Sequence, residues 1–450
     1  MNKIPVIAIF DVGKTNKKLI FFNEQYKIVY EEYYQINEIA DEEGFPCENI
    51  KELSEWILCK YAEFAIHECF EIRAINFSAY GASFVHIDSN GKLLTPLYNY
   101  LKPFPENIKE QFYKQYPTEC SIAKQTASPV LGNLNSGMQL YRLKYVSPEI
   151  YGKVKYSLHL PQYLSYLISS KAATEITSLG CHTQLWDFEK NNYHKWVFDE
   201  GLTSKLAPIY SGDKIEKITN NDTQIIVGMG LHDSSAALIG YLAEFEEPFV
   251  LLSTGTWSIT LNPFNYAPLS EVELRQDCLC YLSYKGNPVK ASRLLAGPEH
   301  EIQTKRMAAH FKKAEDYFSG VKYDNNIIQY LKSSKDYVLD EDSSFEIRNL
   351  NTYLNYEVAY HQLIADMVAQ QRRSTNLVLN DMIVKRIYVD GGFSKNEVYM
   401  HLLANIFTGF EVYAATVAQA SALGAALAIH HHWNDKALPD NIIEVKLYSV

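Results

Sequence analysis

The sequence has no long apolar run: nowhere does it reach the about 18 consecutive apolar residues that a membrane-spanning helix requires. The first apolar segment, residues 4–10, is followed at once by Asp11 and is too short for the apolar region of a secretion signal. Cysteine is scarce as well, since the seven cysteines are odd in number, scattered and without the spacing of a zinc site. We therefore expect a cytoplasmic protein with reduced thiols and no membrane partner.

An excess of positive charge is also missing. The chain carries 42 Lys and Arg against 53 Asp and Glu, so its net charge at pH 7 is −11 and its pI is about 5.7. A surface that binds duplex nucleic acid needs a basic stripe, and the sequence contains none. Nucleic acid is therefore not an expected partner. ATP is not excluded, because it needs only a local set of backbone amides and a metal ion.

The first half of the chain alternates short β-rich runs with a helical pattern, which is typical of an α/β domain with a mixed sheet. Residues 103–160 are richer in Pro, Asn and Gln and are expected to add helices and loops to this domain. The expected helix spans 50–69, and the expected strands are 4–13, 17–23, 28–34 and 73–81.

The same order begins again after a charged, proline-containing stretch near residue 245. Residues 249–263 have the pattern of a strand, a polar turn and a second strand, and residues 384–393 form a strand that enters a glycine turn. A chain of this length suits two domains of about 200 residues each. We therefore expect two domains of similar plan, 1–245 and 246–450.

Three helices are expected in the second half. An amphipathic helix covers 357–374, an Ala-rich helix covers 418–432, and a helix at 394–408 begins with the capping-box spacing of Ser394 and Glu397. The three histidines that end the Ala-rich segment could form a metal tract, but a solvated helix end is the favoured interpretation.

Two Gly- and Thr-rich turns, one at the start of each half, carry the first chemical signal. The first is DVGKTNKK at 11–18 and the second is STGTWS at 253–258. Glycine lets backbone amides turn toward an anion, and the lysines of the first turn add positive charge. One such turn is common in ordinary hairpins, but two at matching places favour a pair of phosphate loops. Asp11, beside the first turn, is a suitable ligand for Mg²⁺.

Asp233 lies between an expected strand and an expected helix in the segment GMGLHDSS, residues 228–235. The helix dipole favours its ionised form. Local sequence leaves two roles open: a helix cap, or a general base that accepts the proton of an attacking hydroxyl. The segment VDGGFSKN at 389–396 is open in the same way, between a tight turn and a surface for a flat group.

Taken in order, the motifs DVGKTNKK, GLHDSSA, STGTWS, VDGGFSKN and QASALGAA resemble those of the FGGY carbohydrate kinases, members of the actin and hexokinase ATPase superfamily. The matches run from residue 5 to about residue 430. The resemblance implies an α/β fold of two ribonuclease-H-like domains with the active site in a central cleft. It also implies ATP and Mg²⁺, with the sugar bound by the N-terminal domain and ATP by the C-terminal domain.

The functional residues of the family can be carried over onto this sequence motif by motif. Asp233 matches the catalytic base, and Asp11 matches the acidic residue near the metal. The implied substrate-binding residues are Gly81, His232, Asp233 and Ser234. The implied ATP-binding residues are Gly13, Lys14, Thr15, Asn16, Lys18, Gly255, Thr256, Gly391, Gly392 and Asn396.

Three stretches, 80–100, 134–143 and 182–188, look closest to the rhamnulokinases of this family. They imply an ATP-dependent kinase that phosphorylates a hydroxyl of a small, rhamnulose-like ketose. The sequence departs from the family at Lys14, where most relatives have Thr or Ser. It departs again at 100–103, which lacks the usual acidic residue, and at 293–302, where rhamnulokinases carry an Asn and an aromatic motif.

Several alternatives stay open. Fuculose, xylulose or another pentulose is the alternative substrate class. A sugar-binding regulator without activity is less favoured, because Asp11 and Asp233 are both present. An actin-type ATPase or scaffold is the least favoured, because the sugar loop at 78–88 resembles that of the kinases. The expected partners are a small sugar and ATP, and the sequence allows a homodimer without fixing the oligomeric state.

Overall fold

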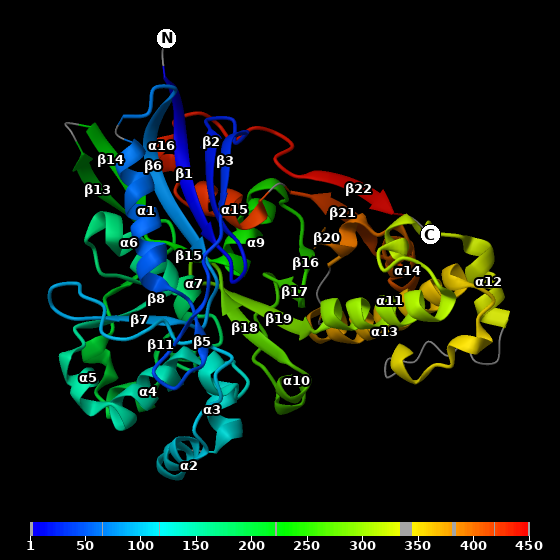
Figure 1. Ribbon diagram of the computed structural model, residues 1–450, viewed down its shortest axis with the longest axis horizontal. Coiled ribbons are helices and arrows are strands. Elements are labelled where there is room, and N and C mark those ends of the chain that lie inside the picture. The colour runs from blue at the N-terminus through cyan, green and yellow to red at the C-terminus, as the bar shows by residue number, and fades with distance from the viewer. Residues whose placement is uncertain are drawn as a thin grey trace.

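The computed structural model describes residues 3–448 apart from 65, 117, 221–222, 334–343, 380–383 and 418. Two seven-stranded sheets organise the chain, and they lie side by side with helices between and around them (Figure 1). The strands of the first sheet all precede residue 233, and those of the second all follow residue 248.

The first sheet has the strand order β13-β14-β6-β1-β2-β3, with the short β15 beside β6. Strands β1, β2 and β3 are antiparallel neighbours, whereas β1, β6 and β14 run parallel. The strands are β1 Ile4–Val12, β2 Lys17–Asn23, β3 Ile28–Tyr34, β6 Phe70–Ala79, β13 Ile215–Asn220, β14 Thr223–Gly228 and β15 Leu231–His232.

Helices cover both faces of this first sheet. Helices α1 (Ile50–Phe64) and α6 (Leu160–Ser169) pack on one face, and α9 (Asp233–Glu244) and α15 (Ala420–Ala428) pack on the other. Alternate side chains of β1 therefore point into different cores, so that Phe10 faces α1 while Ile9 faces α15. A strand buried on both faces has a continuous apolar sequence, which explains the run that begins the chain.

The second sheet has the order β18-β19-β17-β16-β20-β21-β22. Strands β16, β17 and β19 are antiparallel neighbours, and β16, β20 and β21 run parallel, which repeats the central plan of the first sheet. The strands are β16 Phe249–Thr254, β17 Ser258–Asn262, β18 Cys278–Leu282, β19 Pro288–Leu294, β20 Arg386–Gly391, β21 Glu411–Thr416 and β22 Glu444–Tyr448.

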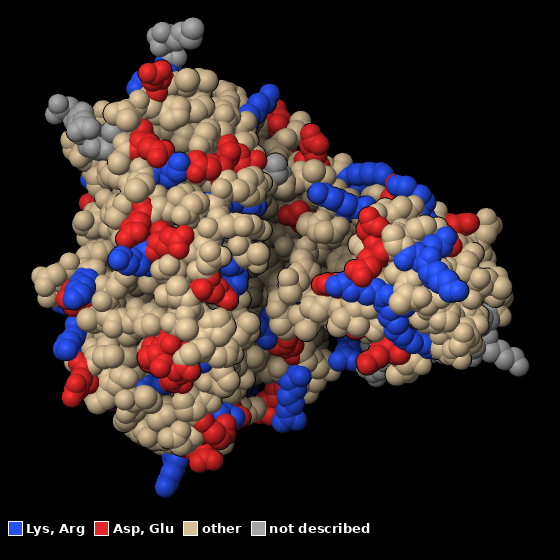
Figure 2. All heavy atoms as spheres, viewed as in Figure 1, with Lys and Arg blue, Asp and Glu red and all other residues tan. Residues whose placement is uncertain are grey.

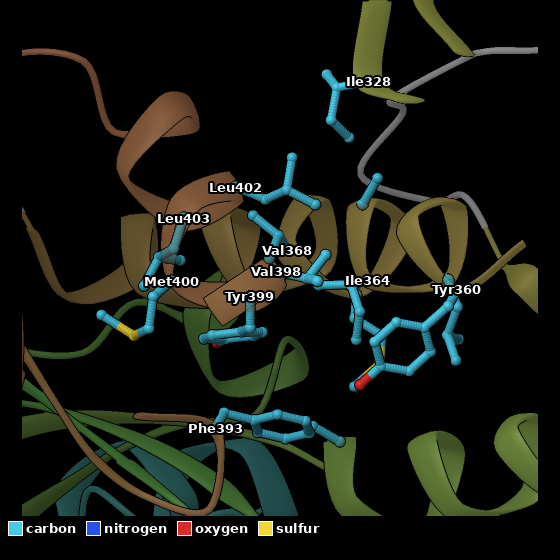
Figure 3. Packing of buried hydrophobic residues seen from close by; sticks show 14 of the residues in the cluster. Ile328, Tyr360, Ile364, Val368, Phe393, Val398, Tyr399, Met400, Leu402 and Leu403 are labelled. Carbon is cyan, nitrogen blue, oxygen red and sulfur yellow. The ribbon is translucent and has the colours of Figure 1, made fainter. Parts of the chain in front are cut away.

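Helices α11 (Ala296–Phe311), α13 (Tyr356–Leu379) and α14 (Glu397–Ile406) form the main core of the second half. Figure 3 shows Ile364 and Val368 of α13 directed toward Val398 and Leu402 of α14. Helix α13 is buried over most of its length, because the sheet and other helices enclose it. The expected amphipathic pattern therefore understates how deeply this helix lies in the core.

Helix α9 lies between the two sheets. Its residues Ala236 and Ile239 belong to the core of the first sheet, while Leu238 and Tyr241 belong to the core on the second. Helix α15 crosses α9 so closely that a Cβ at Gly424 would lie 1.8 Å from the carbonyl oxygen of Ala236. The two helices thus pack backbone to backbone at this point, which only glycine permits.

Smaller elements surround these two cores. Residues 103–160 form helices and loops as expected, together with β8, which pairs with β7. The small elements are β4 Ile39–Ala40, β5 Pro46–Cys47, β7 Phe84–Ile87, β8 Tyr156–His159, β9 Thr174–Glu175, β10 Trp186–Asp187, β11 Asn192–Tyr193, β12 Ile209–Tyr210, α2 Glu106–Gln115, α3 Glu119–Gln125, α4 Ser136–Val146, α5 Pro148–Lys153, α7 Ile176–Leu179, α8 Lys195–Asp199, α10 Glu271–Arg275, α12 Asn325–Ser333 and α16 His430–Trp433. None of the helices in the described ranges is long and apolar enough to cross a membrane.

Two local expectations are wrong. The capping box is absent from α14: its N-cap is Asn396, whose side chain accepts from the Tyr399 amide, and Ser394 instead donates to the Gly391 carbonyl. The reason is a short 3₁₀ turn at 393–395, which delays the helix start. The last histidines are not simply a solvated helix end either, since His430 is buried and its Nδ1 lies 2.6 Å from the Tyr26 hydroxyl.

Candidate active site

Two cavities share Gly255 in their linings: one is lined by residues of both halves of the molecule, and the other by residues of the second half alone. The smaller has a volume of about 310 Å³ and the larger about 460 Å³. Figure 2 shows the surface hollowed between the two halves, with acidic and basic side chains interspersed on the visible face. The candidate site therefore consists of two chambers that adjoin at Gly255.

The topology of the first sheet brings two carboxylates to one edge of this cleft. Asp11 near the end of β1 is in register with Ser78 of β6, and Ser78 is in register with Leu231 of β15. The three strands are parallel, so their carboxyl ends meet at one edge, where ligands of open α/β sheets bind. Asp233, two residues after Leu231, therefore lies near Asp11.

Asp233 is the first residue of α9, and the N-cap position belongs to His232. The capping role that local sequence left open is therefore wrong. Its Oδ1 accepts hydrogen bonds from the Ser234 amide and hydroxyl, at 2.6 and 3.2 Å, and lies 3.2 Å from His232 Nε2. The surrounding protein desolvates the carboxyl and raises its pKa to about 6, which the Ser234 hydrogen bonds only partly oppose. A carboxylate with such a pKa can accept a proton near neutral pH.

Asp11 is nearly buried. The hydroxyl of Ser421, near the start of α15, donates to its two carboxylate oxygens at 3.1 and 3.0 Å. Burial raises its pKa to about 6, and the negative charge of Asp233 adds to that shift. Ser421 had no role in the sequence analysis, because nothing local indicates that residue 421 returns to the first sheet.

The predicted sugar-binding residues Gly81, His232 and Ser234 line the smaller cavity together. Gly81 leaves no room for a side chain: a Cβ there would lie 2.9 Å from Cys181 Sγ and 3.0 Å from the His232 ring. His232 is held by Cys181 at 3.1 Å and by Ser235 at 3.2 Å. Burial lowers the pKa of His232 to about 4, so it meets a ligand as a neutral ring.

The first glycine turn is closed by a hydrogen bond from the Gly13 amide to the Asn16 carbonyl at 2.9 Å. Thr15 and Asn16 are exposed at its tip. The lysines predicted to bind ATP have protein partners here: Lys14 pairs with Glu38 at 2.7 Å, and Lys18 donates to Gln419 at 2.6 Å. Their contact with ATP stays a prediction.

Lys17 lies in the same turn but was missed by the sequence analysis. It is almost fully buried, pairs with Glu48 at 2.9 Å and donates to the Lys14 carbonyl at 3.1 Å. The Tyr80 hydroxyl also donates to Glu48, at 3.3 Å, and Tyr80 lines the smaller cavity. This chain of contacts joins the first turn to the wall of the smaller cavity. No local pattern distinguishes Lys17 from its neighbours, because its role depends on a distant glutamate.

Thr254 connects the second glycine turn, residues 253–258, to the segment 389–396, which forms a third glycine turn. Its hydroxyl donates to the Asp390 carbonyl at 2.5 Å and accepts from the Phe393 amide, while its carbonyl accepts from the Gly392 amide at 3.0 Å. Gly391 adopts φ +87°, and a Cβ there would lie 1.8 Å from the Thr254 carbonyl oxygen. Glycine is therefore required at 391 by both conformation and space.

The larger cavity contains three of the predicted ATP-binding residues, Gly255, Gly392 and Asn396. Asn396 donates to the Tyr360 hydroxyl at 2.8 Å, and His300 Nε2 lies 3.1 Å from the same hydroxyl. The sequence analysis missed His300, Phe318 and Tyr360, which add aromatic surface to this chamber. An apolar, aromatic wall beside a few polar groups suits a flat heterocycle.

Residues 293–302, which the sequence marked as a departure without a role, lie at the junction of the chambers. Arg293 lines the smaller cavity and His300 the larger one. Gly297 donates its amide to the Thr256 carbonyl at 3.1 Å, and a Cβ at 297 would lie 2.7 Å from the Gly255 carbonyl. The departure in sequence therefore falls inside the candidate site.

Among the described residues, no group of three or more His, Cys, Asp and Glu is arranged to hold a metal ion. The two nearby carboxylates still fit Mg²⁺, which takes one or two carboxylates and completes its shell with water and phosphate oxygens. The like charges of Asp11 and Asp233, which raise the pKa of Asp11, would be neutralised by such a cation.

Two sheets of matching order with a cleft between them define an α/β protein of the actin and hexokinase-like fold. Solved structures confirm that expectation. A carbohydrate kinase from Novosphingobium aromaticivorans matches with a TM-score of 0.78 at 20% identity, covering 98% of this chain and 96% of that one. A xylulose kinase from Lactobacillus acidophilus matches with a TM-score of 0.79 at 16% identity, covering 99% and 94%. At this identity the likeness establishes the fold alone.

Sequence profiles identify the family. The FGGY family of carbohydrate kinases, N-terminal domain, matches residues 6–240, and two profiles of FGGY C-terminal domains match 246–328 and 356–433. The chain therefore belongs to the FGGY family of carbohydrate kinases, as the resemblance predicted.

Curated relatives are more distant and are matched only in part. A rhamnulokinase of Halalkalibacterium halodurans is 26% identical over 263 residues, 55% of this chain and 54% of that protein. An L-fuculokinase of Escherichia coli is 25% identical over 284 residues, 58% and 57% of the two chains. The chain thus aligns with about half the length of these relatives.

Proposed function

We propose that the protein is an ATP-dependent kinase that transfers the γ-phosphoryl group of ATP to a hydroxyl of a small, rhamnulose-like ketose. The observation that carries the proposal is the shared wall of the two chambers at Gly255, with Asp233 between His232 and Ser234, which both line the smaller chamber. A donor in one chamber and an acceptor in the other would meet at this wall, which is what phosphoryl transfer requires.

In this proposal the N-terminal domain, residues 1–245, binds the sugar, and the C-terminal domain, residues 246–450, binds ATP. The grouping of Gly81, His232 and Ser234 around the smaller chamber supports the first assignment. The aromatic wall of the larger chamber, beside Gly392 and Asn396, supports the second, because it suits an adenine ring.

Asp233 is proposed as the catalytic base. Its ionised carboxylate would accept the proton of the attacking hydroxyl while neutral His232 orients the sugar. Backbone amides of the turns at Gly13 and Gly255 would hold the phosphate oxygens, together with the side chains of Thr15, Asn16, Lys14, Lys18 and Thr256. Asp11 would hold Mg²⁺, whose charge neutralises the phosphate oxygens when it is bound.

The choice of a rhamnulose-like ketose rests on the motifs at 80–100, 134–143 and 182–188 and on the rhamnulokinase relative. The fuculokinase and xylulose kinase relatives keep fuculose and xylulose as alternatives. We infer a cytoplasmic location from the use of ATP and from seven free thiols.

A coupled assay of ADP release tests this function. The purified protein is assayed with Mg²⁺-ATP against rhamnulose, fuculose, xylulose and other polyols, with a no-sugar control. We expect ADP release that depends on the sugar, strongest with a six-carbon deoxyketose. ADP release without any sugar would indicate an ATPase of the actin type. A protein that binds sugar without releasing ADP would be a regulator.

A further inference from the structure

Arg293 lies on β19 in register with Ile259 of β17, next to the second glycine turn. Among the described residues that line the smaller cavity, it is the only permanent cation. Its neighbours in the lining include Trp257, His182 and Tyr281. The position belongs to the segment 293–302, where the sequence departs from the rhamnulokinase pattern.

The guanidinium of Arg293 is fixed in place but not fully satisfied. Its side chain is only 8% exposed, and Nη2 donates to Asp277 Oδ1 at 2.5 Å. The guanidinium carbon lies 5.1 Å from the centre of the Trp257 ring, which fits a cation–π contact. The buried Nε, in contrast, has no hydrogen-bond partner. Leaving a charged donor unpaired costs free energy, so a guanidinium with unused donors at the wall of a cavity is a candidate for ligand binding.

Arg293 and Asp233 both act on the groups around the smaller cavity: their charges shift the pKa of Cys181 and of Tyr281 in opposite directions. Burial, the charge of Arg293 and His232 together lower the pKa of His182 to about 3. The pKa of Asp233, by contrast, is set by its own burial and by the hydrogen bonds from Ser234. Arg293 is therefore not a cause of the raised pKa of Asp233, the group proposed to accept the proton.

We propose that Arg293 is a specificity-determining residue whose guanidinium donates to an oxygen of the sugar substrate in the smaller cavity. The inference rests on the proposed function, because it assumes that this cavity holds the phosphoryl acceptor. A guanidinium binds a carboxylate oxygen of a sugar acid or a hydroxyl oxygen of a ketose through the same contact. Trp257 and Asp277 hold the guanidinium in position for it.

Kinetics of three variants test the assignment. Arg293→Met removes the donors, Arg293→Lys keeps the charge, and Arg275→Met is the matched control, since Arg275 is exposed on the neighbouring helix α10. With the best ketose and its matched aldonic acid, we expect Arg293→Met to raise the sugar KM by about 10- to 100-fold, the range for a hydrogen bond to a charged group. The kcat and the KM for ATP should change less than about threefold, Arg293→Lys should recover part of the loss, and Arg275→Met should match the parent protein.

Binding without turnover gives a second readout. Trp257 is 40% exposed, whereas Trp56, Trp186, Trp196 and Trp433 are all buried, so sugar binding in this cavity should change mainly the Trp257 fluorescence. A sugar titration without ATP should give a Kd that Arg293→Met raises by the same factor as KM. Unchanged ATP binding and thermal midpoint in Arg293→Met confirm that the variant is folded.

The outcomes separate the inference from the proposed function. A preference for the aldonic acid that Arg293→Met abolishes would identify a carboxylate as the partner oxygen, and a preference for the ketose would identify a hydroxyl. A kcat loss at unchanged sugar KM would overturn the assignment and place Arg293 on the transferred phosphoryl group. Unchanged kinetics and binding would also overturn it. If the parent protein releases no ADP with any polyol, the proposed function fails instead. The sugar titration without ATP then tests on its own whether Arg293 binds the sugar.

Discussion

At the scale of single residues, two neighbouring carboxylates have different surroundings. Asp11 accepts hydrogen bonds from the Ser421 hydroxyl and is nearly buried, whereas about one third of the Asp233 side chain is exposed. Only Asp233 is therefore accessible to a substrate hydroxyl. The difference separates a proposed metal-binding role from a proposed base.

Replacing Asp233 with Asn tests the base. Asn keeps the size of the side chain but cannot accept a proton, so we expect kcat to fall by a factor of about 10² or more with sugar binding nearly unchanged. Steady-state ADP release and a sugar titration measure the two effects. Asp199→Asn, an exposed change on α8, serves as the control. Near-normal turnover of the Asp233 variant would show that another group takes the proton.

The pH dependence of kcat/KM follows from the same carboxyl. Burial raises the pKa of Asp233 to about 6, so its proton is bound more tightly than in a free aspartate. The base must be ionised, and kcat/KM should therefore be constant well above pH 6 and fall about tenfold per pH unit below it. Because Asp11 titrates nearby, the midpoint is an apparent value for the pair. A profile flat down to pH 4.5 would contradict the assignment.

Residue types in local motifs were predictable, and residues that act through distant contacts were not. Gly81, His232 and Gly255 lie within recognisable segments, and the structure brings them to one cavity. Arg293 and His182 reach that cavity from separate parts of the chain. Because their roles depend on tertiary contacts, composition and spacing contain no signal for them beyond the unusual sequence around 293.

At the scale of elements, the third glycine turn depends on backbone shape. Gly391→Ala would place a Cβ in contact with the Thr254 carbonyl at a positive φ, so we expect a loss of about 2 kcal/mol or more in stability and weaker ATP binding. Gly392→Ala is the matched control for stability, because its φ is −63° and a Cβ there meets nothing within 4 Å. Thermal midpoints with and without ATP measure both variants. Equal midpoints would show that the turn tolerates side chains at 391.

The first turn depends on a buried ion pair. Lys17→Met would leave Glu48 buried without a cation, which typically costs about 3–5 kcal/mol. The double variant Lys17→Met with Glu48→Leu removes both charges, and we expect it to recover much of that stability. Denaturation of the two single variants and the double variant gives the coupling directly. Additive losses would mean that the pair does not hold the turn.

Most elements were predictable from periodicity, and the errors lie at their ends. The strands that begin each half and the helices 50–69 and 357–374 were expected close to where they occur. The start of α14 was not predicted correctly. The turn at 393–395 that precedes it is held by a hydrogen bond from the Phe393 amide to Thr254, which lies on a strand far away in sequence.

At the scale of the whole molecule, the chain does not divide cleanly into two independent halves. Helix α15 comes from near the end of the chain, yet it packs on the first sheet against Ile7 and Ile9 (Figure 1). The repeated order of strands made the two sheets predictable. The return of α15 was not, since an Ala-rich segment does not indicate which sheet it covers.

A fragment of residues 1–245 should therefore expose an apolar face. We expect it to aggregate or to bind a hydrophobic dye when it is expressed alone, and to be recovered as a complex when it is co-expressed with residues 246–450. Size-exclusion chromatography and dye fluorescence, with the full chain as reference, measure this. A monomeric 1–245 fragment with a cooperative thermal transition would show that the first sheet does not need α15.

The large separation in sequence between β1 and α15 also sets an order of events during synthesis. The face of the first sheet that carries Ile7 and Ile9 must wait until residues 420–428 have left the ribosome before it can be covered. The nascent chain therefore exposes an apolar surface during most of its translation, so its yield in a cell should depend on chaperones that bind it until α15 has been synthesised.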